Sequence, residues 1–194
     1  MPPPFVGLTG AIAAGKSEAL AAFTKLGAAT LSSDALVHEL LADERIREGL
    51  VERSGDEIAP AGVLDRGRVG AIVFERPAEL AWLESVLHPL VGERVAEWRA
   101  ALPPETPLAV VEVPLLFETG MEDAFDATVS VVADDAVRAA RAGDRGTDLF
   151  EGRSARQLSQ EEKAQRADFV VRNDGSLDEL RQTLSRVLAK LDGL

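Results

Sequence analysis

Two glycines with four residues between them stand directly before a lysine and a serine near the amino end of the chain. The stretch reads Gly10, Ala11, Ile12, Ala13, Ala14, Gly15, Lys16 and Ser17. It matches the pattern G-x-x-x-x-G-K-[ST], in which successive backbone N–H groups surround phosphate oxygens. Lys16 would reach the β- and γ-phosphates of a nucleoside triphosphate, and Ser17 would give its hydroxyl to Mg²⁺.

Such a loop needs a strand before it and a helix after it, and the sequence predicts both. Phe5–Thr9 is apolar enough for a buried strand, and Ser17–Leu26 has helical character. This context favours a nucleotide site over a chance match in an ordinary turn. The pattern alone does not separate kinases, GTPases and motor ATPases.

The rest of the chain alternates apolar runs with helical patterns. The further predicted strands are Ala28–Leu31, Leu108–Val113, Ala127–Val132 and Phe169–Val171. This alternation predicts an α/β fold in three layers, with a five-stranded parallel sheet between helices. A last helix is expected to begin at Ser176, where Glu179 completes a capping box.

A long stretch without strand signals interrupts this alternation. We expect residues 35–105 to form a helical insertion between the second and third strands, and residues 1–34 and 106–194 to form the nucleotide-binding core. The net charge of −12 argues against a nucleic-acid partner. The chain has no cysteine, no apolar run long enough for a bilayer and no secretory signal. A cytoplasmic protein without a membrane partner is therefore expected.

The motifs that would mark a GTPase or a motor ATPase are missing. We find neither D-x-x-G nor N-K-x-D, and Leu108–Val113 does not end in the aspartate of a motor ATPase. A kinase for a small metabolite fits better, and it needs a group that orients the acceptor hydroxyl. Asp34 is the candidate, with a helix N-cap as an equally weighted alternative.

A kinase of this kind also needs mobile cations over the transferring phosphoryl group. The segment of about residues 138–157 is net positive within an acidic chain and contains three glycines. We interpret it as a lid, against the alternative of a solvated helix pair with surface ion pairs. Its arginines are Arg138, Arg141, Arg145, Arg153 and Arg156.

With these pieces in order, the chain resembles the dephospho-coenzyme A kinases over nearly its whole length. The motifs that carry the resemblance are Leu8-Thr9-Gly10, Gly15-Lys16-Ser17, Ser33-Asp34-Ala35, Leu64-Asp65-Arg66, Val73-Phe74, Leu87-His88-Pro89-Leu90, Val113-Pro114-Leu115-Leu116-Phe117-Glu118-Thr119-Gly120, Gln157, Glu162-Lys163, Arg166-Ala167-Asp168-Phe169-Val170-Val171 and Asn173. The resemblance implies transfer of the γ-phosphoryl group of ATP to the ribose 3′-hydroxyl of dephospho-coenzyme A. The fold that it implies is a parallel core with a helical acceptor domain and a lid.

The resemblance also assigns residues. Asp34 would position or deprotonate the 3′-hydroxyl and help to hold Mg²⁺ through water. Arg141, Arg145 and Arg153 would be the lid arginines, and the loop of Asn173 would edge the adenine. His88 and Glu118 would line the acceptor site. The family's loop has glycine, glycine and serine where this chain has Ala11, Ala13 and Ala14, and an aspartate where it has Ser32. Alanine at a position of positive φ would strain the loop.

Several residues have plainer alternatives. His88 before Pro89 fits an extended kink, and Glu118 fits a solvated carboxylate at a strand end. Trp82 and Trp98 could stack on an adenine but are more often core residues at helical spacing. Arg166 and Asp168 are expected to be structural. Two other functions also stay open: a kinase for a nucleoside or a sugar alcohol, and a nucleotide-binding regulator without turnover.

Overall fold

The computed structural model describes residues 2–144 and 157–191, and the chain divides into two compact units. The core unit comprises Met1–Ser32 and Leu102–Leu194, and the helical unit comprises Ser33–Ala101. These boundaries lie two to four residues from the predicted ones, so that Asp34 belongs to the helical unit. Arg145, Arg153 and Arg156, predicted for the lid, lie outside the described residues.

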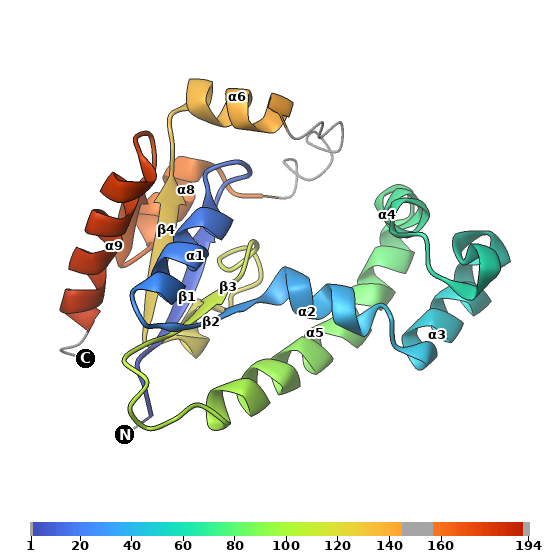
Figure 1. The fold of residues 1–194 in the computed structure, drawn as a ribbon. Coiled ribbons are helices and arrows are strands. Elements are labelled where there is room, and N and C mark those ends of the chain that lie inside the picture. The colour runs from blue at the N-terminus through green and yellow to red at the C-terminus, as the bar shows by residue number, and fades with distance from the viewer. Residues whose placement is uncertain (1, 145–156, 192–194) are drawn as a thin grey trace. The chain divides into compact units, whose positions relative to one another are not determined.

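A five-stranded parallel sheet forms the centre of the core unit (Figure 1). The strands are β1 (Phe5–Gly10), β2 (Ala29–Ser32), β3 (Ala109–Glu112), β4 (Ala127–Val132) and β5 (Phe169–Arg172). Their order across the sheet is β2-β3-β1-β4-β5, so β1 lies in the middle, between β3 and β4. Each strand lies within one residue of its predicted bounds, and the α/β fold predicted from the alternating pattern is confirmed.

The helices of the core unit flank this sheet. They are α1 (Lys16–Lys25), the short 3₁₀ helix η3 (Glu122–Ala124), α6 (Asp135–Asp144), α8 (Gln160–Arg166) and α9 (Leu177–Leu191). Helices α1 and α9 pack against one another and share a buried cluster with the sheet. The helix predicted at 17–26 after the loop is therefore confirmed, one residue earlier.

Successive residues of β1 face opposite sides of the sheet, as the pleat requires. Val6 and Leu8 are fully buried in the cluster shared with α1 and α9. On the opposite face, the ring of Phe5 stacks on Phe125 at 4.6 Å between centroids. Thr9 points to that second face, where it contacts a side chain of α8.

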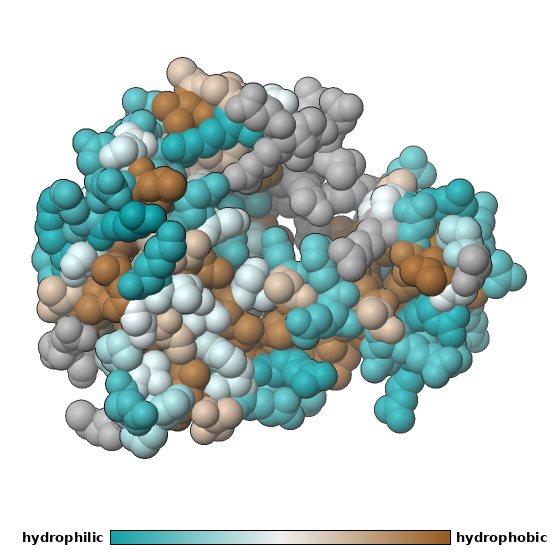
Figure 2. All heavy atoms as spheres, viewed as in Figure 1, coloured by the Kyte–Doolittle hydropathy of each residue, from teal (hydrophilic) through white to brown (hydrophobic). Residues whose placement is uncertain are grey.

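Helix α9 shows how the last segment reaches the sheet. Ser176 caps it: its backbone N–H donates to Glu179 at 2.7 Å, and its hydroxyl accepts from the Glu179 N–H at 3.3 Å. The predicted capping box is thus present. The buried face of the helix carries Leu180, Leu184, Val187 and Leu191. The outer surface over α9 is mostly hydrophilic (Figure 2).

The helical unit contains four α-helices in its described residues. They are α2 (Ser33–Leu40), α3 (Glu44–Ser54), α4 (Arg66–Glu75) and α5 (Pro77–Ala100), with 3₁₀ turns η1 (Asp56–Ile58) and η2 (Pro60–Gly62) between α3 and α4. Asp43 and Asp65 cap α3 and α4 by accepting backbone N–H bonds. Within the described ranges, no helix has both the length and the apolar character needed to cross a bilayer.

Helix α5 corrects one expectation and explains one aromatic residue. The helix continues through Pro89, so the extended kink proposed for His88 is wrong. A long, packed helix accommodates an internal proline when its other contacts offset the lost hydrogen bond. The indole of Trp82 lies against Gly49, and Arg53 stacks over its ring at 4.8 Å. Trp82 is thus packed inside its own unit.

The cap of α9 generates the first prediction. Replacing Ser176→Ala should lower the free energy of unfolding by about 1 kcal/mol, because the first turn loses a hydroxyl acceptor. Urea denaturation measures this change. Ser185→Ala is the matched control, since Ser185 is exposed in the middle of the same helix, and it should cost nothing. Equal losses in both variants would contradict the cap.

Candidate active site

The loop between β1 and α1 requires glycine at positions 10 and 15, the two glycines of its sequence pattern. A Cβ on Gly10 would come within 2.4 Å of the Val131 carbonyl oxygen. Gly15 has a φ of 98° and caps α1, and a Cβ there would lie 2.0 Å from the side-chain nitrogen of Asn173. Any other residue would push the loop away from β4 or from Asn173. The two glycines therefore let neighbouring segments close around the loop.

Three side chains from the far end of the sequence hold the carbonyl groups of this loop. Asn173 Nδ2 donates to Ala14 O at 2.9 Å, and Arg141 Nη1 donates to the same oxygen at 3.4 Å. Arg138 Nε donates to Ile12 O at 3.1 Å. Because these bonds fix the carbonyls, they also fix the orientation of the peptide N–H groups between them.

Those N–H groups are available as anion donors. Within the described residues, the backbone N–H groups of Ile12, Ala13 and Gly15 donate to no protein acceptor. They lie at the start of α1, where the helix dipole adds about half a positive charge. Unpaired donors at a helix start suit the binding of an anion such as phosphate. The predicted phosphate-binding geometry is thus supported by the backbone as well as by the pattern.

One of the three loop alanines has a strained backbone. Ala13 has a φ of 60°, and it is the one non-glycine residue with positive φ in the part of the chain that the structure describes. Ala11 and Ala14 are buried and adopt ordinary φ values. The strain expected where alanine replaces glycine therefore falls on Ala13 alone. A left-handed alanine costs about 1–2 kcal/mol.

Lys16 and Ser17 begin the helix that follows the loop. The Lys16 ammonium spans the loop, since Nζ donates to Gly10 O at 3.1 Å and to Ala11 O at 3.2 Å. Ser17 is exposed in the first turn of α1. The described residues contain no cluster of three or more histidines and carboxylates that would bind a metal by itself.

The sequence patterns did not point to the carboxylate at the end of β3. Glu112 ends β3, is only 6% exposed and lies in register with Leu8 of β1 and Ser32 of β2. Parallel strands end at the same edge of the sheet, which is where ligands bind in such folds. A lone carboxylate closing an apolar strand was the signal for it.

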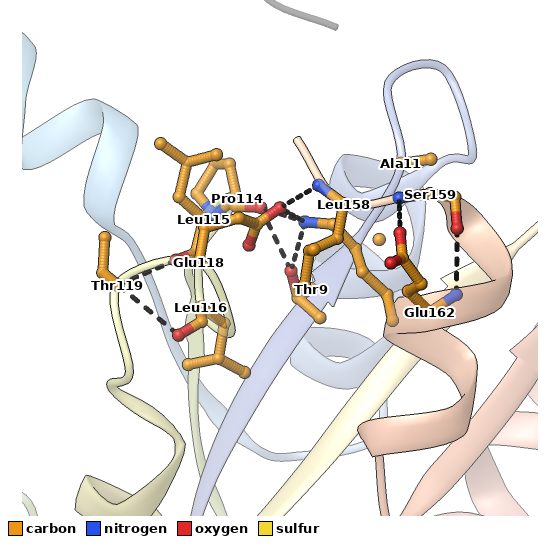
Figure 3. Close-up of polar contacts among 12 residues, drawn as sticks. Thr9, Ala11, Pro114, Leu115, Leu116, Glu118, Thr119, Leu158, Ser159 and Glu162 are labelled. Atoms are coloured by element: carbon orange, nitrogen blue, oxygen red, sulfur yellow. Dashed lines mark hydrogen bonds and ion pairs between the residues drawn. The ribbon is translucent and has the colours of Figure 1, made fainter. Parts of the chain in front are cut away.

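Glu118 is not the solvated carboxylate that one alternative predicted. Its side chain is 11% exposed, and it forms a 2.9 Å ion pair with Lys163, whose side chain is fully buried. Glu118 Oε1 also accepts the Leu158 N–H at 2.8 Å (Figure 3). Burial lowers the pKa of Lys163, while its hydrogen bond and attraction to Glu118 act in the opposite direction.

The loops after β4 and β5 set the place of Asn173. Its N–H donates to Val132 O at 2.8 Å, and the neighbouring Arg172 bridges Asp134 at 2.9 Å and Asp174 at 3.0 Å. The Asp134 N–H, followed by Arg172, lowers the pKa of Asp174. These bonds join the two loops and direct the Asn173 amide at the phosphate loop.

The remaining predicted residues are divided between the units. Asp34 is the second residue of α2 and is exposed; since the helix already begins at Ser33, the N-cap interpretation of Asp34 is wrong. His88 is exposed on α5. Asp168 is structural, as expected, because its carboxylate accepts the N–H and hydroxyl of Thr128, both at 2.8 Å.

The core unit thus brings the loop together with Lys16, Arg141 and Asn173, whereas Asp34 and His88 belong to the helical unit. The sequence did not indicate that Arg138 and Asn173 bind loop carbonyls, because neither contact leaves a local pattern. Nor does the sequence indicate a role for Lys163, which lies within one of the motifs. The fully buried ammonium is visible only in the folded chain.

Known proteins are similar to this chain over nearly its whole length. The family model for dephospho-CoA kinase matches residues 4–179. A Thermus thermophilus relative named dephospho-CoA kinase is 38% identical over 195 residues, which cover 98% of this chain and 93% of the relative.

Two solved structures are similar throughout. A Thermus thermophilus protein superposes with a TM-score of 0.84 at 38% identity, covering 98% of this chain and 99% of that one. A dephospho-CoA kinase from Campylobacter jejuni superposes with a TM-score of 0.71 at 25% identity, covering 97% of both chains.

The strained alanine generates the second prediction. Ala13→Gly should raise the free energy of unfolding by about 0.5–1 kcal/mol, because relief of the left-handed backbone exceeds the entropy that glycine adds to the unfolded chain. Thermal or urea unfolding measures it. Ala14→Gly is the matched control, since Ala14 is fully buried with ordinary φ; it should destabilise the protein. A loss of stability in Ala13→Gly would show that the loop is not strained there.

Proposed function

The chain belongs to the dephospho-CoA kinase family, and from this membership we propose how its own residues carry out the family's reaction. The reaction is the ATP-dependent phosphorylation of dephospho-coenzyme A, which gives coenzyme A and ADP and is the last step of coenzyme A synthesis. The acceptor is an alcohol, which we take to be the ribose 3′-hydroxyl. The single observation that supports the proposed roles best is the phosphate loop, whose carbonyls are held by Arg138, Arg141 and Asn173.

We assign ATP binding to the loop of residues 10–17. The N–H groups of Ile12, Ala13 and Gly15 would donate hydrogen bonds to the β- and γ-phosphate oxygens. Lys16 already lies over the loop, so that a small rotation of its side chain would bring Nζ to the phosphates. Asn173 holds the loop by its amide, and the backbone around it would edge the adenine. Phosphate binding would thus need little rearrangement of the main chain.

Mg²⁺ fits the oxygen donors of this region. Mg²⁺ retains several waters and is bound by few protein ligands when phosphates supply the others. The Ser17 hydroxyl would be a direct ligand, while Asp34 and the buried Glu112 would act through water. Bound there, Mg²⁺ would supply positive charge that offsets the negative charge developing on the phosphates.

The chain's own groups account for the other parts of the transfer. We assign to Asp34 the orientation of the 3′-hydroxyl and the acceptance of its proton as the oxygen attacks the γ-phosphorus. Arg141 and Arg145 would neutralise the transferring phosphoryl group; Arg141 is already beside Ala14. His88 would contact the acceptor, and Glu118 would line the acceptor site from its buried ion pair with Lys163, without presenting an exposed oxygen.

The other parts of the proposal concern partners and place. We propose no nucleic-acid or membrane partner for this acidic chain, and a cytoplasmic location is an expectation from its sequence.

A coupled assay of ADP release over a panel of acceptors tests the reaction. We expect turnover with dephospho-coenzyme A and none with coenzyme A, because the 3′-hydroxyl of the product is already phosphorylated. Nucleosides and sugar alcohols should be poor acceptors. Turnover with one of these alone would favour the other kinase, and ATP binding without any turnover would favour the regulator.

The assignment of Asp34 generates a further prediction. Asp34→Asn should lower kcat about 10²–10⁴-fold, the usual range for loss of a general base, and leave ATP affinity nearly unchanged. Steady-state kinetics and calorimetry with an ATP analogue measure the two quantities. Glu39→Gln is the matched control, because Glu39 is an exposed carboxylate on the same helix. If Asp34→Asn kept the wild-type kcat, Asp34 would have no part in proton transfer.

A further inference from the structure

Lys163 of α8 is a buried cation that has no part in the proposed binding of ATP, Mg²⁺ or the acceptor. Its side chain is 0% exposed, and lysine is almost never fully buried without partners. The three N–H donors of the ammonium each have an acceptor. These are Glu118 Oε1 at 2.9 Å, Pro114 O at 2.5 Å and Thr9 Oγ1 at 3.5 Å. The site is therefore built around the charge.

Two of the acceptors join neighbouring strands at the edge where the phosphate loop begins. Thr9 is the residue before Gly10, and its hydroxyl donates to Pro114 O at 3.2 Å. Pro114 lies two residues after the end of β3, next to β1 in the sheet. The Lys163 ammonium thus bonds both to Thr9, the residue before the phosphate loop, and to Pro114 in the segment that follows β3.

The third acceptor connects this point to the start of α8. Glu118 Oε1 receives both the Lys163 ammonium and the Leu158 N–H, and Figure 3 shows its carboxylate directed at Leu158. A capping box between Ser159 and Glu162 then fixes the first turn of α8. Gln160, the first residue of α8, accepts the Ala133 N–H at 2.7 Å. This bond ties the start of the helix to the end of β4.

We propose that Lys163, paired with Glu118, is a positioning residue for phosphoryl transfer. Its ammonium holds Thr9, and thereby the first residue of the phosphate loop, in a fixed place relative to the segment after β3 and to Leu158. Lys163 contacts no reacting atom, so its effect passes through the backbone of the loop. The inference rests on the proposed function, because it assigns to Lys163 the alignment of the γ-phosphate with its acceptor.

A purely stabilising role does not explain this pair well. Removing two charges from water costs several kcal/mol, and replacement of a buried pair by neutral side chains of similar size is often neutral or stabilising. The second carboxylate oxygen, Glu118 Oε2, is buried and has no hydrogen-bond partner among the described residues. An optimised stability element would satisfy both oxygens. The pair instead fixes how neighbouring segments are placed, since the three N–H donors of Lys163 meet three acceptors on β1 and on the segment that follows β3.

The test compares three variants with the wild type. Lys163→Met alone leaves Glu118 as an unpaired buried charge, which threatens folding, so the informative variant is the double Lys163→Met with Glu118→Gln. The single Glu118→Gln variant reports what the carboxylate contributes by itself. Arg166→Met is the matched control, because Arg166 is an exposed cation on the same helix.

We expect the double variant to have a free energy of unfolding close to that of the Arg166→Met control. Its kcat should fall about 10–100-fold, the size of effect that a small misplacement of reacting groups produces. Glu118→Gln should lose much less, because the ammonium still reaches Thr9 and Pro114. A double variant with wild-type kcat would overturn the inference. So would a loss equal to that of Glu118→Gln alone, or a loss explained entirely by a smaller folded fraction.

The wild type separates this outcome from a failure of the proposed function. If the wild type itself released no ADP with dephospho-coenzyme A, the function would be wrong. If the wild type were active and the double variant equally so, only the role of Lys163 would fall.

Discussion

The shape of the phosphate loop depends on hydrogen bonds to its carbonyl oxygens. A run of small residues between a strand and a helix has no side chains with which to fix itself, so other segments must do so. Asn173 and Arg141 share the Ala14 carbonyl, and Arg138 takes that of Ile12. With the carbonyls bound, the intervening N–H groups are directed at one place, and the strain at Ala13 is maintained by its surroundings.

The same interactions explain how an acidic protein binds a highly charged anion. The net charge is −12, yet Lys16, Arg138 and Arg141 all bond to the loop. Lys163 adds a fourth cation beneath it, neutralised by Glu118. Cations concentrated at one edge of a sheet attract phosphate locally, whatever the total charge.

Much of the core unit could be predicted from local sequence. β1 and β4 show as apolar runs, the loop shows as a pattern, and the cap of α9 shows as Ser176 and Glu179. Each signal lies within a few neighbouring residues. The contacts that shape the site do not: 126 positions separate Arg138 from Ile12, and 154 separate Lys163 from Thr9. No sequence periodicity reveals such a long-range pairing, so no role for Lys163 could be predicted from the sequence. Two predictions for the helical unit were wrong for a local reason. His88 before Pro89 fits an extended kink as well as a continuous helix, and Asp34 fits an N-cap as well as the second residue of a helix.

A crystal structure with a non-hydrolysable ATP analogue and Mg²⁺ would test the central claim most directly. The account predicts β- and γ-phosphate oxygens within hydrogen-bond distance of the N–H groups of Ile12, Ala13 and Gly15. It also predicts that Asn173, Arg138 and Arg141 still bind the same two carbonyls. Phosphates bound away from these N–H groups, or a loop whose carbonyls had turned inward to replace them, would contradict it.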